Sequence, residues 1–205
     1  MVHTILGSSW LPSWFLSALS PTLARGKRVY WIDVGNRFDA YGLSRTTRDL
    51  GLDPRKALAG VQLARPFNVY QLETMMRTKL PASWRGEPII LSDPLAPFLD
   101  EDLPIEEMER LLPLFLDALH RLPAQWIILG VERKTSPERA IVEAALLDDS
   151  DRVSRFSEVN GPISLSALGL DPELRATEDP EAEETTFDWP LPPAIRTPAR
   201  GVLSL

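Results

Sequence analysis

Small polar residues follow an apolar run at the start of the chain, at a point where a strand would pass into a helix. Residues 2–6 are mostly apolar, and Gly7, Ser8 and Ser9 come directly after them. A turn of this composition at a helix start can bind an anion through its backbone N–H groups, helped by the helix dipole. The alternative is an ordinary strand–helix turn packed by the nearby Trp10, and the sequence favours this alternative.

A carboxylate ends the second segment whose residues suggest chemistry. Residues 88–93 form a continuous apolar run that closes with Ser92 and Asp93. We expect Asp93, at the end of this buried strand, to act as a strand-end cap or a salt-bridge partner.

Composition excludes several classes of chemistry. The 205 residues include no cysteine and only two histidines, His3 and His120. This removes disulfides, thiolate metal sites, cysteine nucleophiles and multi-histidine metal centres. The sequence also holds no Ser/His/Asp set, no G-x-S-x-G elbow and no G-x-G-x-x-G loop. We therefore predict no catalytic residues, no metal site and no bound cofactor.

Negative charge is concentrated near the end of the chain. Residues 1–170 hold 19 basic and 21 acidic side chains, whereas residues 171–189 hold one basic and eight acidic side chains. A proline-rich acidic stretch buries too little apolar surface to offset its chain entropy. We therefore expect a core domain at 1–170 and a separate acidic tail at 171–205.

One short part of the tail carries large apolar side chains. Phe187, Trp189 and Leu191 stand beside prolines that restrict the chain towards extended forms. Aromatic anchors of this kind carry much of the energy of an interface, so we predict that the three residues dock a partner. The alternative is that Trp189 packs against its own domain.

Positive charge is concentrated in the first half of the chain. Residues 25–85 carry twelve basic and five acidic side chains. This division is normal for solvated helix faces, which is the interpretation that we favour, but it can also present one basic side to nucleic-acid phosphates. Because the body of the chain is nearly neutral and the tail is acidic, we expect any DNA binding to be weak and salt-dependent.

These residues must be positioned by alternating strands and helices. We expect strands at 2–6, 28–34, 61–64, 88–93 and 125–130, and helices at 13–24, 40–50, 69–80, 104–122 and 137–147, with a short helix starting at 53–54. Pro21 is expected to kink or end the first helix. The strands are unbroken apolar runs, which is typical of a parallel sheet covered on both faces. The predicted fold class is therefore α/β, a three-layer α/β/α sandwich with a mostly parallel central sheet.

Five short segments follow one another between Val29 and Leu72, and their order and spacing match one known family with almost no gaps. They are Tyr30-Trp31-Ile32-Asp33, Arg37-Phe38-Asp39-Ala40-Tyr41, Leu50-Gly51-Leu52-Asp53-Pro54, Ala64-Arg65-Pro66-Phe67-Asn68 and Gln71-Leu72. In this order and spacing they resemble the core of RecA/RadA-type recombinases, and the resemblance extends over residues 2–157. It implies a RecA-like fold in which Asp93 ends the Walker B strand and residues 127–131 form the next core strand. It also makes Arg133, Lys134 and Arg139 candidate DNA contacts, because the family has a DNA-facing loop at this place.

The sequence departs from this family at the phosphate-binding positions. Where the family has G-x-x-x-x-G-K-[ST], Gly7 remains but the later positions read Pro12-Ser13-Trp14. Proline offers no N–H to a phosphate, serine lacks the lysine charge, and tryptophan replaces a small magnesium-binding hydroxyl. The position of the family's catalytic glutamate is held by Gly35. The remnant of the nucleotide site then comprises Gly7, Ser8, Ser9, Ser13 and Asp93, and we expect it to be inactive.

A retained core with an altered phosphate loop implies a non-catalytic RecA/RadA-like accessory or regulatory protein in DNA recombination or repair. It would act through protein–protein contacts with a RecA/RadA-type recombinase or another protein. One alternative is an ATP-binding or ATPase module with an atypical phosphate loop, which would need ATP and Mg²⁺. A second is a RecA-fold regulator outside DNA metabolism. No stretch is apolar enough to span a membrane and no signal-peptide pattern begins the chain, so we expect a cytoplasmic protein without a membrane partner.

Overall fold

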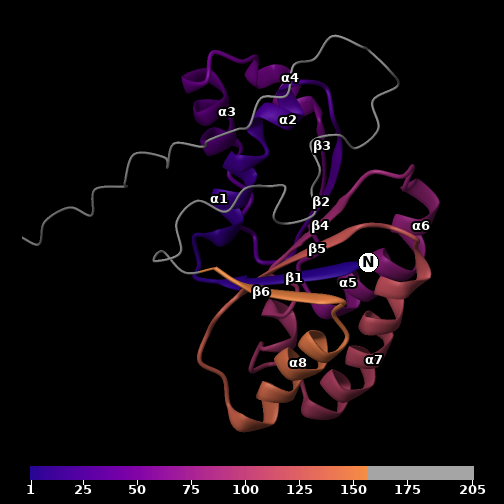
Figure 1. The fold of residues 1–205 in the computed structure, drawn as a ribbon. Coiled ribbons are helices and arrows are strands. Elements are labelled where there is room, and N and C mark those ends of the chain that lie inside the picture. The colour runs from indigo at the N-terminus through magenta and orange to yellow at the C-terminus, as the bar shows by residue number, and fades with distance from the viewer. Residues whose placement is uncertain (157–205) are drawn as a thin grey trace, which may run out of the picture. The chain divides into compact units, whose positions relative to one another are not determined.

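A six-stranded parallel sheet organises residues 1–156, which are the residues that the computed structural model describes (Figure 1). The strands are β1 (Val2–Gly7), β2 (Val29–Asp33), β3 (Val61–Ala64), β4 (Ile89–Ser92), β5 (Trp126–Val131) and β6 (Arg152–Arg155). Their order across the sheet is β3-β2-β4-β5-β1-β6, and every neighbouring pair is parallel. The predicted α/β class with a parallel central sheet is confirmed.

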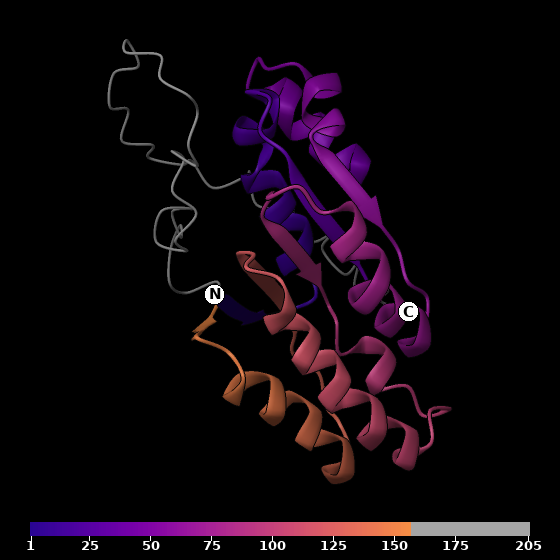
Figure 2. The ribbon, with the colours of Figure 1, turned by 90° about the vertical axis from the view of Figure 1, so that its right-hand side faces the viewer.

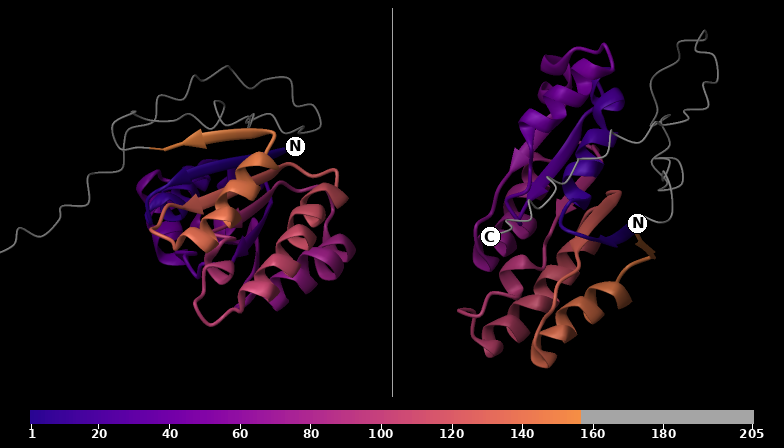
Figure 3. Two further views of the ribbon diagram at one scale, coloured as in Figure 1. Left: turned by 90° about the horizontal axis from the view of Figure 1, so that it is seen from below. Right: turned by 90° about the vertical axis from the view of Figure 1, so that its left-hand side faces the viewer.

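Helices cover both faces of the sheet (Figures 1 and 2). One layer holds α1 (Leu11–Ala18), α2 (Ser20–Ala24), α3 (Ala40–Asp49) and α4 (Pro54–Ala59). The other layer holds α5 (Val69–Thr74), the π-helix η1 (Met75–Lys79), α6 (Leu80–Ser83), the 3₁₀ turn η2 (Ala96–Phe98), α7 (Ile105–Arg121) and α8 (Pro137–Asp148). Figure 3 shows the same elements from below and from the opposite side. The described residues therefore form a three-layer α/β/α sandwich.

The central strands are apolar because both of their faces are covered. All four residues of β4 and the first five residues of β5 are buried. Trp31 of β2 and Trp126 of β5 are among the largest fully buried side chains. Removing a large apolar side chain from water contributes about 1.5–3 kcal/mol, so the strands supply much of the stability of the fold.

Proline divides the first predicted helix into two. α1 ends at Ala18, and α2 begins at Ser20 with Pro21 in its first turn. Pro21 lacks the N–H that would bind the Ser17 carbonyl in a continuous helix. The hydroxyl of Ser20 donates to that carbonyl instead, at 2.6 Å. The helix expected over 13–24 is thus ended before Pro21.

Two further elements differ from the sequence prediction. The helix expected over 69–80 contains the five-residue π-helix η1 and continues as α6 to Ser83. The edge strand β6 was not predicted, because Arg152-Val153-Ser154-Arg155 is short, polar and mostly exposed. It pairs with β1, and Nε2 of the buried His3 lies 2.9 Å from Oγ of Ser154.

Other predictions concern the end of the chain and the membrane. The tail at 171–205, with the proposed docking residues Phe187, Trp189 and Leu191, lies outside the described residues. Within the described part, none of the helices combines the length and the apolar character needed to cross a bilayer.

Candidate functional site

Two buried carboxylates lie side by side where the central strands of the sheet end. Asp33 is the last residue of β2 and is paired in register with Ser92 of β4, and Asp93 follows directly. Asp33 is 0% exposed and Asp93 is 1% exposed. An ionised carboxylate is costly to bury unless cations and hydrogen-bond donors surround it. The carboxyl edge of the sheet is therefore the place where the described residues concentrate buried charge.

Asp33 is fully engaged by its own loop and by one arginine. Its Oδ1 accepts the backbone N–H of Arg37 at 2.7 Å, and its Oδ2 accepts the backbone N–H of Phe38 at 3.1 Å. The guanidinium of Arg65 donates to Oδ2 from Nε at 3.0 Å and forms an ion pair with it at 2.9 Å. Asp33 thus fixes the loop between β2 and α3 and holds Arg65 beside it.

Two arginines bind a single oxygen of Asp93. Nε of Arg37 lies 3.3 Å and a terminal nitrogen of Arg133 lies 2.6 Å from Oδ2 of Asp93. The backbone of Asp93 adopts a left-handed conformation with φ of 55°, and its N–H donates to the carbonyl of Leu129. The other carboxylate oxygen, Oδ1, is buried and has no hydrogen-bond partner within residues 1–156. We refer to Asp33, Asp93, Arg37, Arg65 and Arg133 as the carboxyl-edge cluster.

Gly35 leaves the space that Asp93 occupies. A Cβ atom at position 35 would lie 2.5 Å from Oδ2 and 2.7 Å from Cβ of Asp93. Real Cβ atoms do not approach other atoms so closely, so a larger residue at this position would displace the carboxylate and its two arginines. The resemblance implies a catalytic glutamate at this position. The close approach of Asp93 therefore accounts for the glycine in physical terms.

The first turn of α1 offers few backbone donors to an anion. At the start of α1, the N–H of Leu11 donates to the carbonyl of Ser8, and the N–H of Trp14 donates to the carbonyl of Trp10. Pro12 has no N–H, so Ser13 is the one remaining donor among the first four residues of the helix. Among these four residues, a phosphate would find one backbone donor in place of several.

Aromatic side chains pack together at the same turn. The rings of Trp10 and Trp14 lie 5.0 and 4.6 Å from the ring of Phe156. Arg37 contacts the turn from the other side, where its terminal nitrogen lies 3.4 Å from the carbonyl oxygen of Ser9. These contacts agree with the packed turn that the sequence favoured over an anion nest.

The structure separates the three candidate DNA contacts. Lys134 is exposed, whereas the side chain of Arg133 binds Asp93. Arg139 is 8% exposed, and its guanidinium donates to the carbonyls of Phe98 and Leu103 at 2.6 and 2.7 Å. The burial of Arg139 corrects its assignment as a DNA contact, because both ends of its guanidinium hold the loop before α7.

The sequence analysis missed the role of Arg37 and Arg65. Both were placed among the basic residues of a solvated face, but each forms an ion pair with a buried carboxylate. A signal was present, because two apolar runs that form neighbouring parallel strands both end in aspartate. Buried aspartates require cationic partners, which the nearby arginines could have supplied.

The carboxyl-edge cluster can hold its own side chains and loops in place. Arginine stays protonated at all ordinary pH values, so the three guanidinium groups cannot act as bases or nucleophiles. Asp33 uses both of its carboxylate oxygens to accept from Arg65 and from backbone N–H donors. Oδ2 of Asp93 accepts from Arg37 and Arg133, whereas Oδ1 of Asp93 has no partner within residues 1–156. Within residues 1–156, no three side chains of the usual metal-binding types lie together.

No protein-family model and no curated protein sequence matches this chain.

Proposed function

We propose that this protein is a non-catalytic RecA/RadA-like accessory or regulatory protein in DNA recombination or repair that acts through protein–protein contacts. The observation that carries the proposal is the pairing of Asp93 with Arg37 and Arg133. The resemblance gives Asp93 the position of a Mg²⁺-holding Walker B aspartate, and here two guanidinium groups bind its Oδ2.

Electrostatics supports this reading of Asp93. Two unit charges 4 Å apart interact by about 4 kcal/mol at an effective dielectric constant of 20, so a dication is repelled by about 8 kcal/mol by each guanidinium at that distance. The single carboxylate of Asp93 offsets one such repulsion, but two guanidinium groups contact it. A Mg²⁺ ion would therefore have to displace both arginines, and it would gain no lysine-bearing phosphate loop in return.

An exposed apolar edge supports the protein-contact part of the proposal. β3 is an edge strand, so the backbone groups on its outer side have no neighbouring strand in the described sheet. Leu63 in this strand is 44% exposed, and Phe67 and Tyr70 just after it are 77% and 48% exposed. An edge strand beside exposed aromatic side chains is a suitable surface for a partner segment that adds to the sheet.

The test is binding of the full chain to a purified RecA/RadA-type recombinase from the same host. We expect a complex whose affinity falls at least tenfold in Phe67→Ala, because aromatic anchors dominate interface energies. The matched control is Ile141→Ala, which removes an apolar side chain that is 57% exposed on α8, away from the β3 edge strand. Absence of a complex, or equal losses in the two variants, would contradict the proposal.

A further inference from the structure

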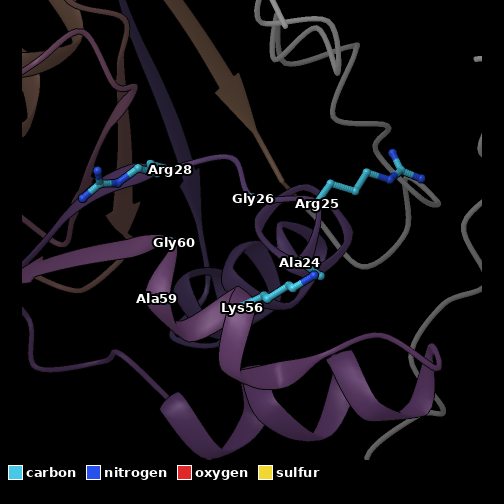
Figure 4. Close-up of a pocket in the computed structure, with 7 residues that line it drawn as sticks. All are labelled: Ala24, Arg25, Gly26, Arg28, Lys56, Ala59 and Gly60. Carbon is cyan, nitrogen blue, oxygen red and sulfur yellow. The ribbon is translucent and has the colours of Figure 1, made fainter. Parts of the chain in front are cut away.

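A hollow of about 470 Å³ lies where α2 and α4 end beside the start of β2 (Figure 4). Its lining includes the basic residues Arg25, Arg28 and Lys56, and each of the remaining lining residues is an alanine or a glycine. In Figure 4, Arg25 and Arg28 extend in opposite directions from the turn at Gly26, and Lys56 reaches from α4 towards Ala24. Because the charges are spread around the hollow instead of converging on one point, the hollow suits an extended acidic segment better than a single small anion.

Two of these cations have no carboxylate partner in the described part of the chain. Arg28 and Lys56 are exposed, and neither forms an ion pair within residues 1–156. α4 contains no acidic residue, and the carboxylate of its N-cap, Asp53, accepts the N–H of Arg55 at 2.9 Å. This cap directs the carboxylate of Asp53 at the positive end of α4. The lining of the hollow therefore keeps an excess of positive charge.

The hollow adjoins the amino end of the edge strand β3. Gly60, which is part of the lining, directly precedes Val61 of β3, and its carbonyl oxygen accepts the N–H of Val29 at 2.9 Å. A Cβ atom at position 60 would lie 2.6 Å from the carbonyl oxygen of Lys27, so glycine is required for this close approach. These contacts hold the start of β3 beside the backbone that carries Arg28.

Apolar side chains are exposed in β3 and just beyond its carboxyl end. They are those of Leu63, Phe67 and Tyr70. A strand rises about 3.3 Å per residue, so the four residues of β3 span about 13 Å, and an added segment of roughly six to eight residues reaches both ends. The outer backbone groups of an edge strand are matched by another peptide backbone, and not by a sugar–phosphate chain. The surface that joins the hollow to Phe67 thus favours a peptide.

We propose that this surface selects partner segments that join an apolar strand to acidic residues, with Arg28 and Lys56 binding the acidic side chains in the hollow. The inference rests on the proposed strand addition at β3 and specifies the chemistry of the partner segment. Apolar side chains of the segment contact Leu63 and Phe67, and its backbone pairs with the outer side of β3. The cations of the hollow then determine which segments bind, because like charges brought together at an interface are strongly disfavoured.

The test begins with a phage-displayed library of random peptides of about twelve residues, which is selected against the immobilised full chain. We expect the recovered sequences to combine alternating apolar residues with a cluster of aspartate or glutamate at one end. One recovered peptide is then synthesised with a fluorescent label, once as recovered and once with lysine in place of every acidic residue. Fluorescence anisotropy should show that the acidic peptide binds at least about tenfold more tightly than the lysine peptide.

Charge reversal in the hollow tests the assigned residues. Arg28→Glu should weaken binding of the acidic peptide about tenfold and strengthen binding of the lysine peptide, because it replaces an attraction by a repulsion. The matched control is Arg152→Glu, which makes the same change at an exposed arginine of β6, at the opposite edge of the sheet, that also forms no ion pair within residues 1–156. It should change both affinities less than about threefold, and melting temperatures establish that each variant is folded.

The possible failures of the two proposals are distinguishable. Recovered sequences with apolar alternation but without acidic residues would leave strand addition at β3 intact and overturn the acidic preference. Acidic sequences without apolar alternation would contradict strand addition itself, and with it the premise of this inference. Equal effects of Arg28→Glu and Arg152→Glu, or a library without any enriched sequence, would also overturn the inference. Displacement of the peptide by an equal concentration of a thymidine 20-mer would assign the hollow to nucleic acid instead.

Discussion

The carboxyl-edge cluster and the exposed arginines of α3 and α4 use the same residue type in opposite ways. At the carboxyl edge, each arginine binds an aspartate that is at most 1% exposed. Arg45 and Arg48 on α3 and Arg55 on α4, which we call the basic face, are exposed and form no ion pair within the described residues. Whether an arginine is structural or available to a ligand therefore depends on where the carboxylates lie, and not on how many cations are nearby.

The two regions should therefore differ in what a mutation costs. Removing a cation from a buried pair leaves an uncompensated charge and typically costs about 3–5 kcal/mol. Removing a cation from a solvated surface usually changes the free energy of unfolding by less than about 0.5 kcal/mol. Stability and ligand affinity are thus expected to respond to different sets of arginines.

The largest effect is expected when Asp93 loses both of its partners. R37A/R133A should lower the free energy of unfolding by about 4 kcal/mol, because a carboxylate that is 1% exposed remains without a cation. R110A/R121A removes two arginines that pair with carboxylates on the surface of α7, and should leave the denaturation midpoint nearly unchanged, because exposed ion pairs contribute little to stability. Urea denaturation of the two variants measures the difference. Similar losses in both variants would show that the buried ion pairs of Asp93 contribute no more to stability than exposed pairs do.

A smaller loss is expected at Gly35. Gly35→Ala places a Cβ atom 2.5 Å from Oδ2 of Asp93, so the loop or the carboxylate must shift. Overpacking of this kind costs about 1–3 kcal/mol. An unchanged denaturation midpoint would show that Asp93 and its arginines can shift without loss of stability, which would contradict a rigid arrangement of the cluster.

The basic face should show the reverse behaviour. R45Q/R48Q/R55Q removes three exposed cations without breaking an ion pair of the described residues, so the free energy of unfolding should change by less than about 1 kcal/mol. Thermal or urea denaturation measures this change. A loss of several kcal/mol would mean that these arginines are structural after all.

The smallest effect is expected at a surface pair on α7. The hydrogen bond from Arg110 lowers the pKa of Glu107 below its ordinary value of 4.5. A carboxylate with a lowered pKa stabilises the folded state above its unfolded pKa, and this contribution is lost as the pH falls through the folded pKa. Arg110→Gln should therefore raise the pKa of Glu107 towards 4.5, as measured by carboxyl NMR titration, without a detectable change in stability at pH 7. An unchanged pKa of Glu107 would show that the pair does not form in solution.

Much of the fold could be predicted from the sequence because the central strands are unbroken apolar runs. The runs at 28–34, 88–93 and 125–130 correspond to β2, β4 and β5, and helices follow each of them. The edge strand β6 escaped prediction because its residues are polar and its pairing with β1 depends on tertiary context. The π-helix η1 has no simple sequence signature either.

The candidate site was less predictable because ion pairs join residues that are far apart in the sequence. Asp93 could be singled out at the end of a strand, but its partners lie 56 positions before it and 40 positions after it. Arg139 follows a predicted strand just as Arg133 does, yet its guanidinium is buried against two carbonyls. Sequence alone cannot say which arginine turns inwards, because that depends on where the loops meet.

Calorimetric titration of the full chain with ATP and Mg²⁺ tests the central claim most directly. The pairing of Asp93 with two arginines and the packed turn after β1 predict no binding tighter than about 100 µM, which corresponds to about −5.5 kcal/mol. The same titration with Mg²⁺ alone should also show no saturable heat. Saturable ATP binding below that limit would contradict the non-catalytic account and favour an ATP-binding module with an atypical phosphate loop.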